Sequence, residues 1–156
     1  MSGFSASGTF INRFSFIHPG IIKALAIGGF NGELMLPLKE LGNQKLNYPL
    51  GTNDFHALFN NEPDTTALKA IPQFIYMGQL DDNDAVQFDD AYSESERNTI
   101  NTHKGKDVQS RFIYCQNLYR QHNFNVRFKT YEAVGHWTTS AMNLEVIKFF
   151  LKQMQQ

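Results

Sequence analysis

Short apolar runs alternate with helix-like segments along the chain. Apolar residues recur at helical spacing over residues 10–17, and Pro19 ends that pattern. The stretches 21–28 and 72–78 are nearly continuous in apolar character, which is typical of strands buried on both faces. The stretch 124–134 alternates apolar and polar residues, as a half-buried strand does. The pattern therefore predicts about three strands, each separated from the next by helical segments.

Four further helices are expected from the same pattern, at 65–71, 93–100, 107–123 and 138–156. The second of these begins with a Ser93/Glu96 pair at capping-box spacing. In the last helix we expect one stripe to be buried, made of Leu144, Ile147, Phe150, Leu151 and Met154. Strands that alternate with helices predict an α/β fold, with a mostly parallel sheet covered by helices.

The segment 31–63 breaks this periodicity with Gly, Pro and Asn residues. It keeps Leu, Phe and Tyr, so we interpret it as an ordered, lid-like insertion in a single domain that spans 1–156. The alternative is a surface excursion packed on the core. If the segment is a lid, its apolar residues would line an acyl or alcohol pocket, namely Leu34, Leu36, Tyr48 and Phe55.

Composition narrows the classes of partner. With 156 residues, 42% of them hydrophobic, and a net charge of −1, the chain can bury a core and is not expected to be disordered. Its Lys and Arg residues are scattered, so no nucleic-acid partner is expected. No apolar run approaches the ~20 residues of a membrane span, so no membrane partner is expected. The single cysteine, Cys115, excludes an intrachain disulfide and fits a cytoplasmic location.

Parallel sheets carry active groups at the carboxyl ends of their strands. The chain begins with "GFSASG", in which Ser5 has the small residues Gly3 and Ser7 two positions away on either side, directly before a helical pattern. Such a tight turn can hold up a nucleophilic serine. Ser7 is the alternative nucleophile, but Thr9 would then occupy a position where its β-branched side chain fits less well.

Two more candidate residues follow strand ends. Asp81 comes three residues after Gly78, where a carboxylate can orient an imidazole. Asp82 and Asp84 compete for this role. His136 lies in the loop after the last strand, where an imidazole can act as a general base.

The motifs "GFSASG", "GQLDD" and "VGHW" resemble the nucleophile elbow, acid loop and histidine loop of the α/β-hydrolase superfamily, in that order. The resemblance covers essentially all of the chain and is to the C-terminal half of that fold. It implies a serine hydrolase of the esterase or acyl-hydrolase type. Ser5 would be the nucleophile, His136 the base and Asp81 the triad acid, and the backbone N–H of Ala6 would be an oxyanion donor.

The sequence departs from the family's pattern in two ways, and both change what we expect of the chain's activity. Ser7 stands where the family most often has glycine, and the strands that precede the elbow, with the second oxyanion donor, are missing from the pattern. We therefore expect a truncated chain that acts on a small acyl substrate. The alternative is an inactive remnant or interaction module that pairs through its exposed sheet edge, either as a homodimer or with a complementing N-terminal half.

No cofactor and no metal are expected. The acidic run 81–90 lacks the central glycine of a calcium-binding loop. The sequence has no His/Cys spacing typical of zinc, and no glycine-rich phosphate loop follows a strand.

Overall fold

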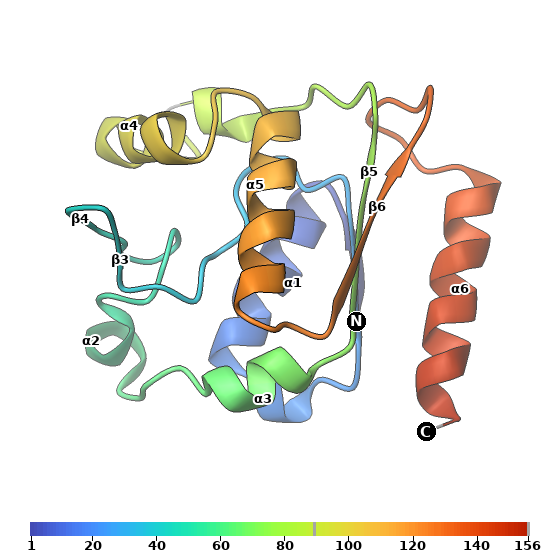
Figure 1. Cartoon of the computed structure of the whole chain (residues 1–156), viewed down its shortest axis with the longest axis horizontal. Helices are drawn as coiled ribbons and strands as arrows, with labels where there is room; N and C mark the ends of the chain where they lie inside the picture. Colours follow the sequence, from blue (N-terminus) through green and yellow to red (C-terminus); the bar gives the residue numbers. More distant parts are fainter. Residues whose placement is uncertain (89, 156) are drawn as a thin grey trace.

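The computed structural model describes residues 1–88 and 90–155 and contains a four-stranded parallel sheet with the order β1-β2-β5-β6. The strands are β1 (Ser2–Phe4), β2 (Leu25–Gly28), β5 (Gln73–Gly78) and β6 (Val126–Tyr131). All four point the same way (Figure 1). Their carboxyl ends therefore lie along a single edge of the sheet.

Helices cover both faces of this sheet. The helices α1 (Ala6–Ile17) and α5 (Val108–Gln121) lie on one face, with α3 (Thr65–Ala70) at one end of it, and α6 (Ser140–Met154) lies on the other (Figure 1). The helix α4 (Glu94–His103) begins with the expected Ser93/Glu96 capping box. Two short 3₁₀ turns complete this set, η1 (Pro19–Ile21) and η2 (Ala85–Gln87). The predicted α/β class is confirmed.

The sheet has one more strand than the pattern predicts. Residues 2–4 form β1, which pairs in parallel with β2. The expectation that the strand before the elbow is missing was therefore wrong. Three residues, one of them glycine, are too few to show alternation. They become a strand because β2 offers them backbone partners, so the signal lies in the tertiary structure.

The expected buried stripe of the last helix was also wrong. Four of its residues, Leu144, Ile147, Leu151 and Met154, are 51% to 82% exposed. The helix instead buries Met142 and Val146 against the sheet. Both stripes have helical spacing, so the sequence pattern could not select between them. The position at which the preceding loop ends determines which side of the helix packs against the sheet.

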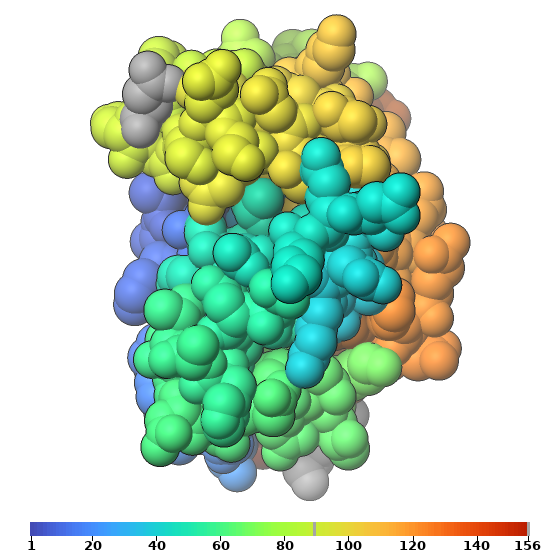
Figure 2. Space-filling view, turned by 90° about the vertical axis from the view of Figure 1, so that its left-hand side faces the viewer, coloured from blue at the N-terminus to red at the C-terminus, as the bar shows by residue number. Residues whose placement is uncertain are grey.

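The segment 31–63 forms an outer layer on the side of the molecule opposite α6, where it is drawn in cyan to green (Figure 2). It holds a two-stranded antiparallel ladder of β3 (Glu40–Leu41) and β4 (Gln44–Lys45), followed by α2 (Phe55–Phe59). Many of its apolar side chains belong to the main core, among them Leu34, Leu36 and Phe55. These three residues are therefore packing residues and do not line an open pocket.

None of the helices in the described part of the chain is long and apolar enough to cross a bilayer.

One polar cluster fastens α6 to the sheet. Glu145 accepts hydrogen bonds from Arg127 (2.8 Å), Lys129 (2.6 Å) and Tyr131 (2.5 Å), which all belong to β6. Partial burial alone would raise the pKa of Glu145, but hydrogen bonds from Lys129, Tyr131 and Arg127 outweigh it. They lower the pKa from its ordinary 4.5 to about 2. The ionised carboxylate is thus the form that holds the helix.

This cluster predicts a pH-dependent contribution to stability. The folded pKa of Glu145 is depressed, so its contribution is present above about pH 4.5 and is lost as the pH falls towards 2. Glu145→Gln should lower the free energy of unfolding at pH 7 by about 1 kcal/mol, because the pairs are partly exposed. Urea unfolding from pH 7 to pH 2 measures this difference, which should shrink below pH 4.5. The matched control is the exposed Glu132→Gln, and an equal loss in both variants would contradict the prediction.

Candidate active site

Ser5 lies on a strained turn between β1 and α1. Its backbone has φ 59° and ψ −132°, a left-handed conformation that is uncommon for a residue with a side chain. Its N–H donates to the carbonyl of Gly28 (3.0 Å), which continues the pairing of β1 with β2. A Cβ atom on Gly3 would lie 2.5 Å from the carbonyl oxygen of Ser7, so only glycine fits there. The structure thus places Ser5 on a tight strand-to-helix turn with a small residue two positions before it.

Ser7 has a defined task beside this turn. Its Oγ accepts from the N–H of Phe4 (3.0 Å) and donates to the carbonyl of Phe4 (2.7 Å). Because the neighbouring Ser5 N–H points to β2, these groups of Phe4 face the open side of the sheet. Ser7 therefore satisfies the outward-facing backbone groups at the end of an edge strand.

Three side chains from distant parts of the sequence form a continuous hydrogen-bonded chain. Nε2 of His136 is 2.8 Å from Oγ of Ser5. Nδ1 of His136 lies 2.9 Å and 3.0 Å from the two carboxylate oxygens of Asp81. The ring of Phe4 packs beside the imidazole, with centroids 5.0 Å apart. The structure thus brings together the three residues that the sequence selects.

The chemistry of these partners fixes the direction of the hydrogen bonds. An ionised carboxylate can only accept, so Nδ1 of His136 carries the proton and donates to Asp81. In the neutral ring Nε2 then accepts from the hydroxyl of Ser5. The Asp81 side chain is 1% exposed, whereas that of His136 is 19% exposed. The carboxylate is therefore shielded from water while the serine end of the chain of hydrogen bonds stays accessible.

The acid and histidine loops are joined to each other at the ends of β5 and β6. The N–H of Gln79 donates to Tyr131 and that of Leu80 donates to Val134, both at 2.8 Å. A Cβ atom on Gly78 would lie 2.3 Å from the carbonyl oxygen of Val134, so the two loops touch through a glycine. These contacts set the separation of Asp81 and His136.

The alternative residues are engaged elsewhere or face solvent. Asp84 accepts from Arg111 and from the N–H of Val86 (3.0 Å) at the start of η2. Asp82 is exposed. The hydroxyl of Ser7 is used by Phe4, as described above. Asp89, within the acidic run, lies outside the described residues.

The N-terminus of α1 supplies the candidate oxyanion donor. As the first residue of the helix, Ala6 has no intrahelical acceptor for its N–H, and the helix dipole favours negative charge at this point. A cavity of about 360 Å³ begins at Ala6. It is lined by one face of α1 and by two loops, including Thr9, Phe10, Arg13, Tyr48 and Tyr92.

Some of the residues that line the cavity could be predicted from the sequence, and others could not. Ala6, Thr9, Phe10 and Arg13 have the spacing of one helical face, so a helix starting at the elbow would have predicted them. Of the residues expected to form the pocket, Tyr48 alone lines this cavity. Tyr92 was missed. It comes from the loop before α4 and accepts a hydrogen bond from Arg13 (2.8 Å), a contact that no local pattern predicts.

A larger hollow of about 540 Å³ lies between β6 and α6. None of Ser5, Asp81 and His136 lines either space, but the 360 Å³ cavity includes Ala6, next to Ser5. The larger hollow includes Pro72 and Gln73, at the amino end of β5, whereas Asp81 follows the carboxyl end. Within the described parts of the chain, no three His, Cys, Asp or Glu side chains gather closely enough to hold a metal ion.

Several solved structures resemble this chain. One is poly(aspartic acid) hydrolase-1 from Sphingomonas sp. KT-1, with 20% sequence identity, a TM-score of 0.60 and coverage of 94% of this chain and 52% of that protein. Another is LpqC, a poly(3-hydroxybutyrate) depolymerase from Bordetella parapertussis, with 16% identity, a TM-score of 0.58 and coverage of 99% and 50%. A third is Arabidopsis thaliana SOBER1, with 13% identity, a TM-score of 0.51 and coverage of 98% and 51%. The chain thus spans about half the length of each.

No protein-family model and no curated protein matches the sequence. The structural likeness nevertheless defines the fold, because the neighbours are α/β-hydrolase-type proteins and the match extends over nearly the whole chain. The chain has the fold of about half of an α/β-hydrolase, and its order of elements corresponds to the C-terminal half. At these identities the likeness describes the fold alone.

The close approach at Gly3 yields a stability prediction. Gly3→Ala should lower the free energy of unfolding by about 2 kcal/mol, because the new methyl group meets backbone atoms of Ser7 that cannot move freely. Thermal and urea unfolding measure the loss. Gly20→Ala is the control, since no atom lies within 4 Å of its added Cβ. If both variants unfold at the same urea concentration, the elbow is less tightly packed than described.

Proposed function

We propose that this chain is a serine hydrolase of the esterase or acyl-hydrolase type. The observation that supports this proposal is the series of hydrogen bonds Ser5–His136–Asp81 at the carboxyl edge of the sheet. A cavity begins at Ala6, the residue after Ser5. The hydrolase-type structural neighbours support the general class. Their named substrates, a poly(aspartic acid) and a poly(3-hydroxybutyrate), are an amide and an ester polymer, and both have acyl carbonyls that the same groups can attack.

The proposed mechanism follows from the direction of the hydrogen bonds. Oγ of Ser5 attacks the acyl carbonyl while Nε2 of His136 takes its proton, and Asp81 stabilises the imidazolium that forms. The oxyanion that develops on the substrate accepts from the N–H of Ala6. His136 then gives the proton to the leaving group. A water molecule, deprotonated by His136, then attacks the acyl carbon, the bond from that carbon to Oγ of Ser5 breaks, and His136 returns the proton to Oγ.

The expected rate depends on the oxyanion donors. Ala6 is the one donor proposed here, and loss of a single donor typically lowers the rate about 10²- to 10³-fold. A chain that acts by itself should therefore be a slow hydrolase unless a partner supplies a second donor. The single, buried Cys115 is the observation that supports our proposal of a cytoplasmic location.

Labelling with a fluorophosphonate probe tests the proposal directly. Wild-type protein should be labelled at Ser5, because His136 activates that hydroxyl, and Ser5→Ala should abolish labelling. Asp81→Asn should slow labelling by roughly 10³- to 10⁴-fold, because the amide favours the wrong tautomer of His136. Ser7→Ala is the control for the competing serine and should keep the label. Absence of labelling in the folded wild-type chain would contradict the proposed activity.

The second candidate function is an interaction module that pairs through β1. The supporting observation is that β1 is the last strand of the sheet, with its outer edge unpaired by any other strand described. Such an edge can pair with another chain. The proposed partner is a second copy or a polypeptide that supplies the N-terminal half found in the structural neighbours. Ser7 already occupies the outward groups of Phe4, so Ser2 is the free position.

Substitution at Ser2 tests this pairing. Because Met1 and Ser5 bond to β2, the N–H of Ser2 faces away from the sheet, and Ser2→Pro removes it while leaving the bonds to β2. If β1 pairs with a second copy, sedimentation should show dimers in the wild type and at least a tenfold weaker dimer in Ser2→Pro. Ser2→Ala, which keeps the N–H, is the control. An unchanged dimer in Ser2→Pro would place the interface elsewhere.

A further inference from the structure

The first turn of α5 lies against the loop that carries Asp81. Nε2 of Gln109 donates to the carbonyl of Gly78 (2.9 Å) and to the carbonyl of Asp81 (2.7 Å). The same loop is closed by a hydrogen bond from the N–H of Asp81 to the carbonyl of Gly78 (3.2 Å). A single side-chain amide therefore spans both ends of the turn that delivers the carboxylate.

The position of the Asp81 side chain depends on this backbone. Among the described residues, its carboxylate accepts one hydrogen bond besides the contact with His136, from the N–H of Asn83 (3.2 Å) in the same loop. A local bond of this kind moves with the loop and does not fix it to the body of the protein. The amide of Gln109 does attach the loop to the body of the protein, because Gln109 belongs to a fourteen-residue helix that packs on the core.

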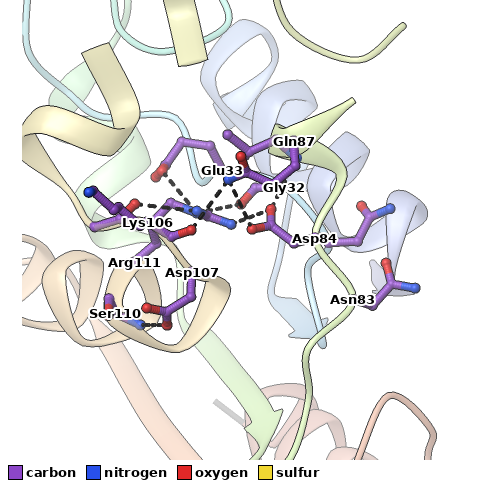
Figure 3. A network of polar contacts seen from close by, with 12 residues as sticks. Gly32, Glu33, Asn83, Asp84, Gln87, Lys106, Asp107, Ser110 and Arg111 are labelled. Carbon is purple, nitrogen blue, oxygen red and sulfur yellow. Dashed lines mark hydrogen bonds and ion pairs between the residues drawn. The ribbon is translucent and has the colours of Figure 1, made fainter. Parts of the chain in front are cut away.

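The far end of the loop is held by a second side chain from the same turn. Arg111 pairs with Asp84 and donates to the carbonyl of Gly32 at 3.4 Å (Figure 3). It also donates to the carbonyl of Gly105 at 3.4 Å. Its side chain is fully buried. The start of α5 is itself fixed, since the carboxylate of Asp107 accepts from Ser110 (Figure 3). The segment 78–84 is thus held at both ends by α5.

We propose that Gln109 is a positioning residue for the triad acid. It acts through the backbone of Gly78 and Asp81 and keeps the carboxylate opposite Nδ1 of His136. Gln109 acts through Asp81, and neither residue lines the cavity at Ala6, so its effect falls on the chemical step and not on substrate binding. This inference rests on the proposed hydrolase function for its kinetic consequence, but not for the geometry that it predicts.

The test uses Gln109→Met and Gln109→Glu, which keep the length of the side chain and remove its amide donor. We expect kcat for p-nitrophenyl acetate to fall about 10- to 100-fold with KM within twofold, because a displacement of ~1 Å in a catalytic group costs rates of this order. The fall should be larger for Gln109→Glu, whose carboxylate faces two carbonyl oxygens. The downfield ¹H NMR resonance of the His136 Nδ1 proton should weaken or move in both variants.

The matched control is Gln121→Met, the same substitution at the exposed last residue of α5. It should change neither kcat nor the resonance. If folded Gln109 variants keep wild-type kcat and an unchanged resonance, the positioning role is overturned. The NMR measurement needs no turnover, so it separates two failures. A wild type without Ser5-dependent hydrolysis contradicts the proposed function, whereas a shifted resonance in Gln109→Met still supports the positioning role.

Discussion

The parallel pairing of β1 with β2 is the constraint on which the site depends. Three residues of β1 must hold Ser5 in a left-handed conformation, which costs on the order of 1–3 kcal/mol. A strand that short cannot meet this cost alone. The turn is fixed on the side that faces β2. There, Ser5 bonds to Gly28, and α1 contacts both β1 and β2. Ser7 closes the open side of the turn. The turn at Ser5 therefore depends on tertiary contacts, although its residues are contiguous.

The other two residues of the site depend on the next pair of strands. β5 and β6 are neighbours in register from Gln73 to Gly78, so the loops that leave them begin side by side. Asp81 and His136 lie 55 positions apart in the sequence, but their side chains meet because they follow neighbouring strands. Parallel order alone brings such loops to one edge. The backbone hydrogen bonds between the two loops then limit how far the loops can move relative to each other.

This division explains what the sequence could and could not predict. Residues 72–78 carry their strand signal in their own composition, and the helix caps are equally local. The placement of Asp81 followed from knowing which strand it succeeds. In contrast, β1 and the sheet-facing side of α6 are decided by partners far away in the sequence. The same holds for Gln109, whose side chain bonds to residues 28 and 31 positions away and leaves no periodic signal.

Two of the polar networks described above differ in burial, and this difference separates their roles. Glu33 is fully buried, with Nζ of Lys104 at 3.3 Å and Nε of Arg111 at 3.9 Å (Figure 3 includes Glu33 and Arg111). Cys115 donates to Glu33, and burial, reinforced by the Glu33 charge, raises the pKa of this thiol well above its usual range. A protonated thiol enclosed in this way is neither nucleophilic nor reachable. The network of His136 instead ends at a half-buried hydroxyl beside a cavity. Accessibility therefore distinguishes the two side chains: the hydroxyl of Ser5 can be reached from solvent, whereas the thiol of Cys115 cannot.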